Sequence, residues 1–167
     1  MRIAAIDPGM SGGIALWDGT HATATPMPLL EDGTLDVAEI RAWFRDHGDV
    51  DLVVLERQQA RPADGGTSAF KTGRGYGELL GMLKSHRIPR EEVAPTVWQR
   101  NLKLVQSHKP EASAYQRKVK QKKAHKAYAQ RRFPDVDLLA TPRSRTPHEG
   151  MCDALCVLEY GRRAFVR

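Results

Sequence analysis

The sequence predicts an α/β domain built around a mixed β-sheet. Short apolar runs that end in turn residues recur along the chain, and such runs are typical of buried strands. Between them lie segments in which apolar residues recur at the spacing of an amphipathic helix. With 167 residues the chain is long enough to bury one sizeable core, so we expect a single domain over residues 1–167.

The N-terminal segment predicts three strands that pair as an antiparallel meander. The strands are expected at Arg2–Ile6, Gly12–Trp17 and His21–Thr25. The sequence DPG breaks the first strand, and DG after the second strand is a hairpin signal. Asp7 therefore lies at the carboxyl end of the first strand.

A helix and a fourth strand are expected next. Apolar residues recur at helical spacing over Val37–Phe44, and Asp36 precedes them as a cap. Asp51–Leu55 is a β-branched apolar run, which favours a central parallel strand buried on both faces. Glu56 ends this strand, so it should lie near Asp7 if the two strands are neighbours.

The rest of the chain predicts loops, further helices and one short strand. Residues 57–75 are rich in Gly, Arg, Pro and Asp, which favours a loop and the approach to a helix. Helices are expected at Tyr76–His86, within VWQRNL, at Lys109–Phe133 and at Glu149–Phe165, and a short strand at Glu91–Ala94. In the last helix, Cys152 and Cys156 have no further Cys or His ligands nearby, so buried free thiols are favoured over a zinc site.

Basic residues are concentrated in one stretch of the chain. The net charge is +6, and from Arg100 to Arg132 eleven Lys and Arg residues are accompanied by a single acid, Glu111. Such a run is usually a solvated helix face, but an excess of this size favours contact with a polyanion such as nucleic acid. The residues that we expect to contact DNA are Lys118, Lys120, Lys122, Lys123 and Lys126.

The sequence predicts a cytoplasmic protein without membrane contact. Its first residues, MRIAAID, are too short and too quickly acidic for a signal peptide. No apolar run approaches the ~20 residues that span a bilayer.

Four acids from distant parts of the chain are candidates for one metal site. Asp7 and Glu56 end buried strands, while Glu149 and Asp153 share one face of the last helix at the spacing i, i+4. Singly, each acid is explicable as a cap or a surface charge. Together they would repel one another near a low-dielectric core, and a divalent cation reverses that repulsion. Oxygen ligands without cysteine suit Mg²⁺ or Mn²⁺.

Such a site predicts hydrolysis of a nucleic-acid backbone. Two ions about 4 Å apart can activate a water molecule and stabilise the leaving oxygen of a phosphodiester. His148 adjoins the acids at the start of the last helix. It is either a solvated or capping histidine, or a catalytic residue that stands beside the metal or orients the water.

Several segments together resemble the RuvC-like Holliday-junction resolvases of the RNase H-like superfamily, particularly the versions carried by bacteriophages. The resemblance covers most of the chain and rests on IAAIDPGMSGGIALW, VVLE, PTVWQRNL, AYAQRRFPD and HEGMCDALCVLEYGRR. It implies the RNase H-like fold, a five-stranded mixed sheet with its first three strands antiparallel and helices on its flanks. It also implies a homodimer that nicks a four-way DNA junction symmetrically, uses two Mg²⁺ ions per active site and leaves 5′-phosphate ends.

The resemblance assigns ligands residue by residue. Asp7, Glu56 and Asp153 match the first-strand aspartate, the fourth-strand glutamate and the last-helix aspartate of the family. The family's fourth ligand lies three or four positions before the last aspartate and is most often Asp. Here the position three before is a glycine, so either Glu149 or His148 must serve.

The resemblance also implies roles for the segment after the fourth strand. Phe70, Lys71 and Arg74 mix aromatic and basic groups, and in the family this region reaches the junction centre, where an aromatic ring can wedge against unpaired bases. Packing of Phe70 into its own subunit is an equal alternative. The family dimerises through the helix that matches Tyr76–His86, for which core packing alone is the alternative.

Two other functions remain open at the level of sequence. A nuclease of the same superfamily that acts on structured RNA would carry the same acids. A non-catalytic nucleic-acid-binding module would carry them for structural reasons. A sugar-kinase-like ATPase is disfavoured, because no second Gly-rich phosphate loop follows and the chain is too short for the usual duplicated domain.

Overall fold

One five-stranded sheet organises the residues that the computed structural model describes, which are 1–59, 65–105 and 113–166. The strands are β1 (Ile3–Asp7), β2 (Gly13–Trp17), β3 (Ala22–Pro26), β4 (Leu52–Glu56) and β5 (Arg90–Val93). They are ordered β3-β2-β1-β4-β5. β2 pairs antiparallel with β1 and β3, while β4 pairs parallel with β1 and β5. The predicted mixed sheet is confirmed, with its first three strands antiparallel.

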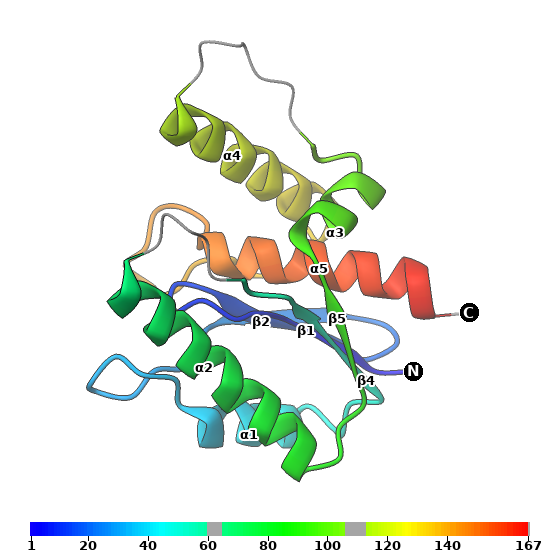
Figure 1. The fold of residues 1–167 in the computed structure, drawn as a ribbon. Coiled ribbons are helices and arrows are strands. Elements are labelled where there is room, and N and C mark those ends of the chain that lie inside the picture. The colour runs from blue at the N-terminus through cyan, green and yellow to red at the C-terminus, as the bar shows by residue number, and fades with distance from the viewer. Residues whose placement is uncertain (60–64, 106–112, 167) are drawn as a thin grey trace.

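Helices cover both faces of this sheet (Figure 1). The helices are α1 (Val37–Asp46), α2 (Gly66–Ser85), α3 (Pro95–Asn101), α4 (Ala114–Arg132) and α5 (Glu149–Phe165). α1 and α2 lie on one face, α5 lies on the other, and α4 packs over α5. In the part of the chain that the structure describes, none of these helices is long and apolar enough to cross a membrane.

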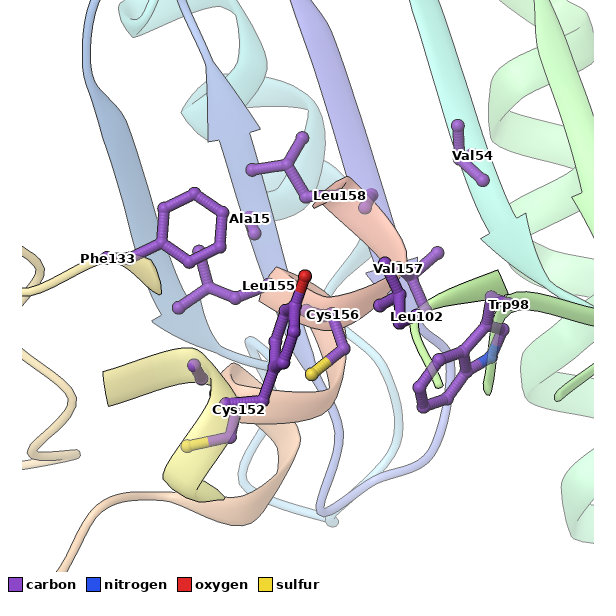
Figure 2. Packing of buried hydrophobic residues seen from close by; sticks show 14 of the residues in the cluster. Ala15, Val54, Trp98, Leu102, Phe133, Cys152, Leu155, Cys156, Val157 and Leu158 are labelled. Carbon is purple, nitrogen blue, oxygen red and sulfur yellow. The ribbon is translucent and has the colours of Figure 1, made fainter. Parts of the chain in front are cut away.

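Two apolar cores hold the sheet between the helices. The first four residues of β1 and of β4 are buried throughout, as their apolar runs predict. On the α5 side, Trp98 packs with α5 residues that include Cys152 and Cys156, and Figure 2 shows this cluster. Both cysteines are buried free thiols, as predicted. On the other side, Phe44 of α1 and Leu83 of α2 belong to the second core.

A buried acid ties the C-terminal end of α4 to α5. Glu159 of α5 is only 3% exposed. Its carboxylate lies 3.1 Å from Arg132 Nε of α4 and 3.0 Å from Arg163 Nε, and Arg162 Nη1 adds a contact at 3.3 Å. Three guanidinium groups thus compensate one buried charge. We call this group the Glu159 cluster.

Three glycines let α5 approach the turn between β1 and β2 at backbone distance. A Cβ on Gly150 would lie 2.1 Å from the carbonyl carbon of Gly12, and a Cβ on Gly13 would lie 2.8 Å from that of Gly150. A larger residue therefore fits at neither position unless the backbone moves. This contact holds the first turn of α5, with Glu149 and Asp153, against the end of β1.

The prediction for the start of α2 is wrong. The composition of residues 57–75 predicts a loop, but the helix begins at Gly66. From residue 66 to residue 74 only the small residues Ala69 and Thr72 are half-buried, and all the others are exposed. The apolar second half of α2 packs on the sheet, and extending a formed helix costs less than starting one, so the glycines do not stop it. In the predicted basic helix, residues 109–112 lie outside the described part of the chain.

Candidate active site

The carboxyl ends of β1 and β4 bring two acids to the same edge of the sheet. The strands pair in parallel, so Asp7 and Glu56, at their ends, come together as predicted. Burial, and then the charge of Asp153, raises the pKa of Asp7 to about 7. Burial, and then the charge of Asp7, raises the pKa of Glu56 to about 8, although a hydrogen bond from Trp98 Nε1 (2.8 Å) opposes this. Near neutral pH Glu56 therefore favours its protonated form, while Asp7 is close to the midpoint of its titration.

Asp153 joins the strand acids from α5 and has basic partners. It is 5% exposed. Lys122 Nζ of α4 donates to Asp153 Oδ2, and His125 Nδ1 lies 2.7 Å from Asp153 Oδ1. Burial would raise the pKa of Asp153, but the His125 hydrogen bond and the Lys122 charge together hold it below its usual value. Burial likewise acts to lower the pKa of Lys122, yet attraction to Asp153 leaves it raised.

Glu149 and His148 occupy the start of α5. The Glu149 side chain is 51% exposed, and its Oε1 lies 3.1 Å from Lys126 Nζ. His148 caps the helix, since its Nδ1 accepts a hydrogen bond from the Met151 N–H at 3.3 Å. Burial lowers the pKa of His148, which favours a neutral ring. A neutral imidazole that accepts at Nδ1 carries its proton on Nε2, so neither nitrogen offers a lone pair to a metal while the cap is formed.

The glycine at position 150 follows from the contact between α5 and the β1–β2 turn. The resemblance predicts the fourth ligand three or four positions before Asp153, which is position 150 or 149. In this chain a Cβ at Gly150 would overlap the carbonyl of Gly12, at 2.1 Å or 2.2 Å from its atoms. An acid at position 150 would push the helix, and Asp153 with it, away from β1. Glu149 is the adjacent residue that offers a carboxylate.

The acids fit a divalent cation by their chemistry. Carboxylate oxygens are the ligands that Mg²⁺ and Mn²⁺ prefer. Asp7 and Glu56 are buried acids whose raised pKa values reflect incomplete compensation by cations of the protein. Across the described residues, no three His, Cys, Asp or Glu side chains stand ready as a ligand group, and Lys122 is bound to Asp153. The carboxylate oxygens are therefore suitable ligands for a divalent cation. In this structure the Lys122 ammonium group takes the place beside Asp153 that such a cation would take.

A cleft opens beside these acids. Its volume is about 530 Å³, and it is lined by both Glu56 and Asp153. A second groove of about 420 Å³ runs along α4 to Glu149. Tyr115 and Lys122 line both hollows, and the Tyr115 side chain is 75% exposed. The lysine-rich helix thus forms a wall beside the acids.

The predicted DNA contacts on α4 follow this wall. Lys118, Lys122, Lys123 and Lys126 line the groove that ends at Glu149. Lys120 is exposed on the same helix. Lys122 and Lys126 also pair with Asp153 and Glu149, so two of the predicted phosphate contacts belong to the acid cluster itself.

The predicted contacts on α2 lie on the other side of the β1–β2 turn. Phe70 is 72% exposed, so the alternative that it packs into its own subunit is wrong. Lys71 lines a groove of about 410 Å³ together with Pro8 and Gly9, which follow Asp7 in the chain. Arg74 Nε lies 2.8 Å from Glu78 Oε1 in an exposed pair. The exposed ring of Phe70 thus precedes Lys71, the one charged residue among the groove's described lining.

The fold that carries these residues is also found in solved structures. The sequence itself matches no family model and no curated protein. In structure the chain is similar to T. thermophilus RuvC in complex with Holliday junction substrate, with a TM-score of 0.59 and 14% sequence identity over 99% of this chain and 97% of that chain. This chain has the RuvC fold. A second Thermus thermophilus RuvC structure gives a TM-score of 0.50 at 15% identity over 98% and 96% of the two chains.

The helix expected to mediate dimerisation has one face packed and one face open. Leu79, Met82 and Leu83 are buried in the core on the α2 side of the sheet. Gly77 and Gly81 are exposed, and a Cβ on either would meet nothing within 4 Å. A second copy could therefore approach this RuvC-like subunit along α2, and homodimerisation stays a prediction.

Sequence reasoning missed three residues of the site. Trp98 binds Glu56, His125 binds Asp153, and Gln121 binds His125. The available signal was the spacing within the basic helix, where Gln121, His125 and Tyr128 recur at helical intervals among lysines. That spacing marks the face of α4 that packs on α5.

Proposed function

We propose that the protein is a metal-dependent endonuclease that resolves four-way DNA junctions. The observation that carries the proposal is the meeting of Asp7, Glu56 and Asp153 at one edge of a RuvC-like fold, beside the lysine-lined cleft. Strongly shifted pKa values beside a cleft are typical of functional sites. The similar T. thermophilus RuvC was solved with a Holliday junction substrate, which supports the same class of substrate here.

We expect four acids to hold two Mg²⁺ ions, with Mn²⁺ as a substitute. The acids are Asp7, Glu56, Asp153 and Glu149. When bound, such a pair of ions activates a water molecule and stabilises the leaving oxygen of a phosphodiester. The strand acids lose their protons to act as ligands, so metal binding should release protons. Lys122 then releases Asp153 and becomes available to neutralise a phosphate in the cleft.

The DNA is expected to lie across the acids between α4 and α2. The lysines of α4 would contact phosphates and supply affinity that falls steeply with salt. On the other side, the exposed ring of Phe70 would stack on an unpaired base at the junction centre, next to Lys71. Phosphate contacts position the strand, and the opened centre of a junction provides the unpaired base.

Symmetric resolution needs two active sites. We therefore propose a homodimer through α2, with a second copy placed against Gly77 and Gly81. Each copy would nick one strand and leave a 5′-phosphate. The resemblance to bacteriophage members supports a role in the cytoplasm of a host cell.

The test of this function is cleavage of defined substrates. Labelled four-way junction, linear duplex and structured RNA would each be incubated with Mg²⁺, Mn²⁺ or a chelator. We expect paired nicks in the junction alone, with 5′-phosphate ends, and no product with the chelator. Equal cleavage of the duplex would argue against a resolvase, and cleavage of RNA alone would favour the RNA nuclease. Binding without cleavage of any substrate would favour the non-catalytic module.

The fourth ligand is tested by two variants at the start of α5. We expect Glu149→Gln to lose more Mg²⁺-dependent cleavage than His148→Ala, because the His148 ring is engaged as a cap. His148→Ser, which preserves a capping side chain, is the matched control. An inactive His148→Ser beside an active Glu149→Gln would make His148 the fourth group.

A further inference from the structure

A chain of three polar groups ends at Oδ1 of Asp153, the carboxylate oxygen that Lys122 does not contact. His125 is 2% exposed, and its Nδ1 lies 2.7 Å from Asp153 Oδ1. Its other ring nitrogen, Nε2, lies 2.6 Å from Gln121 Nε2. Gln121 Nε2 also donates to the Leu104 carbonyl oxygen at 2.9 Å. The chain therefore runs from a backbone carbonyl, through two side chains of α4, to one oxygen of a candidate metal ligand.

The Leu104 carbonyl sets the direction of every hydrogen bond in this chain. A carbonyl oxygen only accepts, so the Gln121 atom that faces it must be the amide nitrogen and not the amide oxygen. The same nitrogen faces His125 Nε2, which must then be the unprotonated, accepting nitrogen. The ring proton is left on Nδ1, where it is donated to Asp153 Oδ1. One backbone group thus selects the tautomer of a buried histidine.

We propose that His125, fixed by Gln121, is a positioning residue that holds Asp153 in the orientation required for a metal ion. Oδ1 faces His125, while Oδ2 accepts from Lys122, its one hydrogen-bond donor among the described residues. All three side chains line the cleft, but the His125 side chain is almost fully buried, at 3% exposed, while the Lys122 side chain is 27% exposed. A cation that displaces Lys122 therefore meets a carboxylate whose rotation is already fixed. Groups that orient a metal ligand in this way typically change metal affinity 10–100-fold when they are removed.

This inference rests on the proposed function, since it assumes that Asp153 binds a divalent ion. The first measurement therefore uses Mn²⁺ binding by calorimetry, without DNA and without turnover. We expect His125→Leu to weaken Mn²⁺ binding roughly 10–100-fold. His125→Asn, whose amide nitrogen can stand near the place of Nδ1, should restore most of the affinity, and His125→Gln, which mimics Nε2, should not. His47→Asn is the matched control, because the His47 ring bonds only within α1.

The second measurement is the tautomer itself. Nitrogen NMR of imidazole-labelled wild-type protein should show His125 protonated on Nδ1 alone, both without metal and with Mg²⁺. In Gln121→Leu the preference for this tautomer should weaken, and Mn²⁺ affinity should fall less than in His125→Leu. A wild-type ring protonated on Nε2, or a His125→Leu variant with unchanged Mn²⁺ affinity, would overturn the inference. If His125→Leu does not fold, the difference between the Asn and Gln variants decides.

The two proposals fail in different ways. Wild-type protein that binds Mn²⁺ no better than Asp7→Asn would defeat the metal-dependent function. Wild-type binding that depends on Asp7 and Asp153 but not on His125 would leave that function standing and defeat the positioning role alone.

Discussion

The strand acids and the helix acid of the candidate site are neutralised in opposite ways. Asp7 and Glu56 lie at buried strand ends, where burial is the main cause that raises their pKa values to about 7 and about 8. Asp153 is buried as well, yet its pKa lies below the usual value because it has the partners His125 and Lys122. The strand acids thus favour protonation, whereas the helix acid stays ionised beside an ammonium group and an imidazole.

The difference shows how a protein can keep several carboxylates together before a metal arrives. Unpaired, ionised acids at this spacing would destabilise the fold. Protons on two acids and Lys122 on the third remove most of that charge, and both are exchangeable for a cation. The same site can therefore be stable without metal and still bind a metal ion with high affinity.

The largest effect is expected from Asp7→Asn, which removes a strand acid. Removing a residue that only orients a metal ligand lowers activity by up to ~100-fold, so loss of the ligand Asp7 itself should lower cleavage by more than that. Junction binding should be retained in gel-shift assays. At pH 8 the metal-free variant should also melt at a higher temperature than wild type, because a buried ionised carboxylate has been replaced by a neutral amide. Full nicking activity in this variant would show that the strand acids are not the catalytic site.

Gly150→Ala should separate the helix acid from the strand acids. The added Cβ would overlap the backbone of Gly12, so α5 must move. We expect the free energy of unfolding to fall by about 3 kcal/mol or more in urea titrations, together with Mn²⁺ affinity. The control is Gly73→Ala, an exposed glycine within α2 with free space around it, which should stabilise by about 0.5–1 kcal/mol. Wild-type stability in Gly150→Ala would contradict the close backbone contact.

The pH dependence of stability should separate the two kinds of acid. The strand acids bind protons more tightly in the native state than in the unfolded state, where their pKa values are near 3.8 and 4.5. Proton binding by these two acids therefore stabilises the native state fully below about pH 4. This stabilisation decreases as the pH rises and is lost once the pH has passed their native pKa values of about 7 and about 8. Asp153 has a lowered pKa, so its ionised form stabilises the native state at neutral pH, and this stabilisation is lost only as the pH falls into the acidic range. Metal-free protein should lose about 4 kcal/mol of unfolding free energy between pH 6 and pH 9, the larger share of it from Glu56.

This loss can be checked by urea unfolding in the presence of a chelator. Saturating Mg²⁺ should remove most of the decline, since the ion replaces the protons. The double variant Asp7→Asn/Glu56→Gln should show a flat profile over the same range. Equal stability of wild type at pH 6 and pH 9 would refute the raised pKa values.

The smallest effect is expected from Lys122→Met. Removing the ammonium group leaves Asp153 open to a metal ion, so Mn²⁺ should bind more tightly, by about fivefold, since a charge at about 4 Å is worth about 1 kcal/mol even in water. Lys123→Met, one residue along the same helix and exposed, should change the affinity less. Weaker Mn²⁺ binding in Lys122→Met would mean that the lysine supports the metal and does not compete with it.

The sequence alone predicts where Asp7, Glu56 and Asp153 lie in the secondary structure. A short apolar run that stops at an acid fixes both the strand and the place of the acid, which is why Asp7 and Glu56 were correctly assigned to neighbouring strand ends. The i, i+4 spacing in α5 likewise predicts that Asp153 and Glu149 share one face, although only Asp153 is buried there. These inferences depend on local patterns that the fold preserves.

The partners of Asp153 could not be predicted in the same way. The lysines of α4 are chemically equivalent in the sequence, and only the docking of α4 on α5 turns Lys122 toward the acid. That docking is set by buried residues such as Tyr128 and Cys156, far apart in the chain. The tautomer of His125 depends in turn on the carbonyl of Leu104, which no side-chain pattern reports.

The Glu159 cluster bears on how a cation would replace Lys122 in the proposed metal site. Because Arg132 anchors the C-terminal end of α4 to α5, the helix does not need to swing aside when an ion displaces Lys122. Only the lysine side chain has to rotate, and side-chain rotation is many orders of magnitude faster than the displacement of a packed helix. If the proposed metal site is correct, metal loading should then be limited by loss of water from the ion and not by movement of the protein.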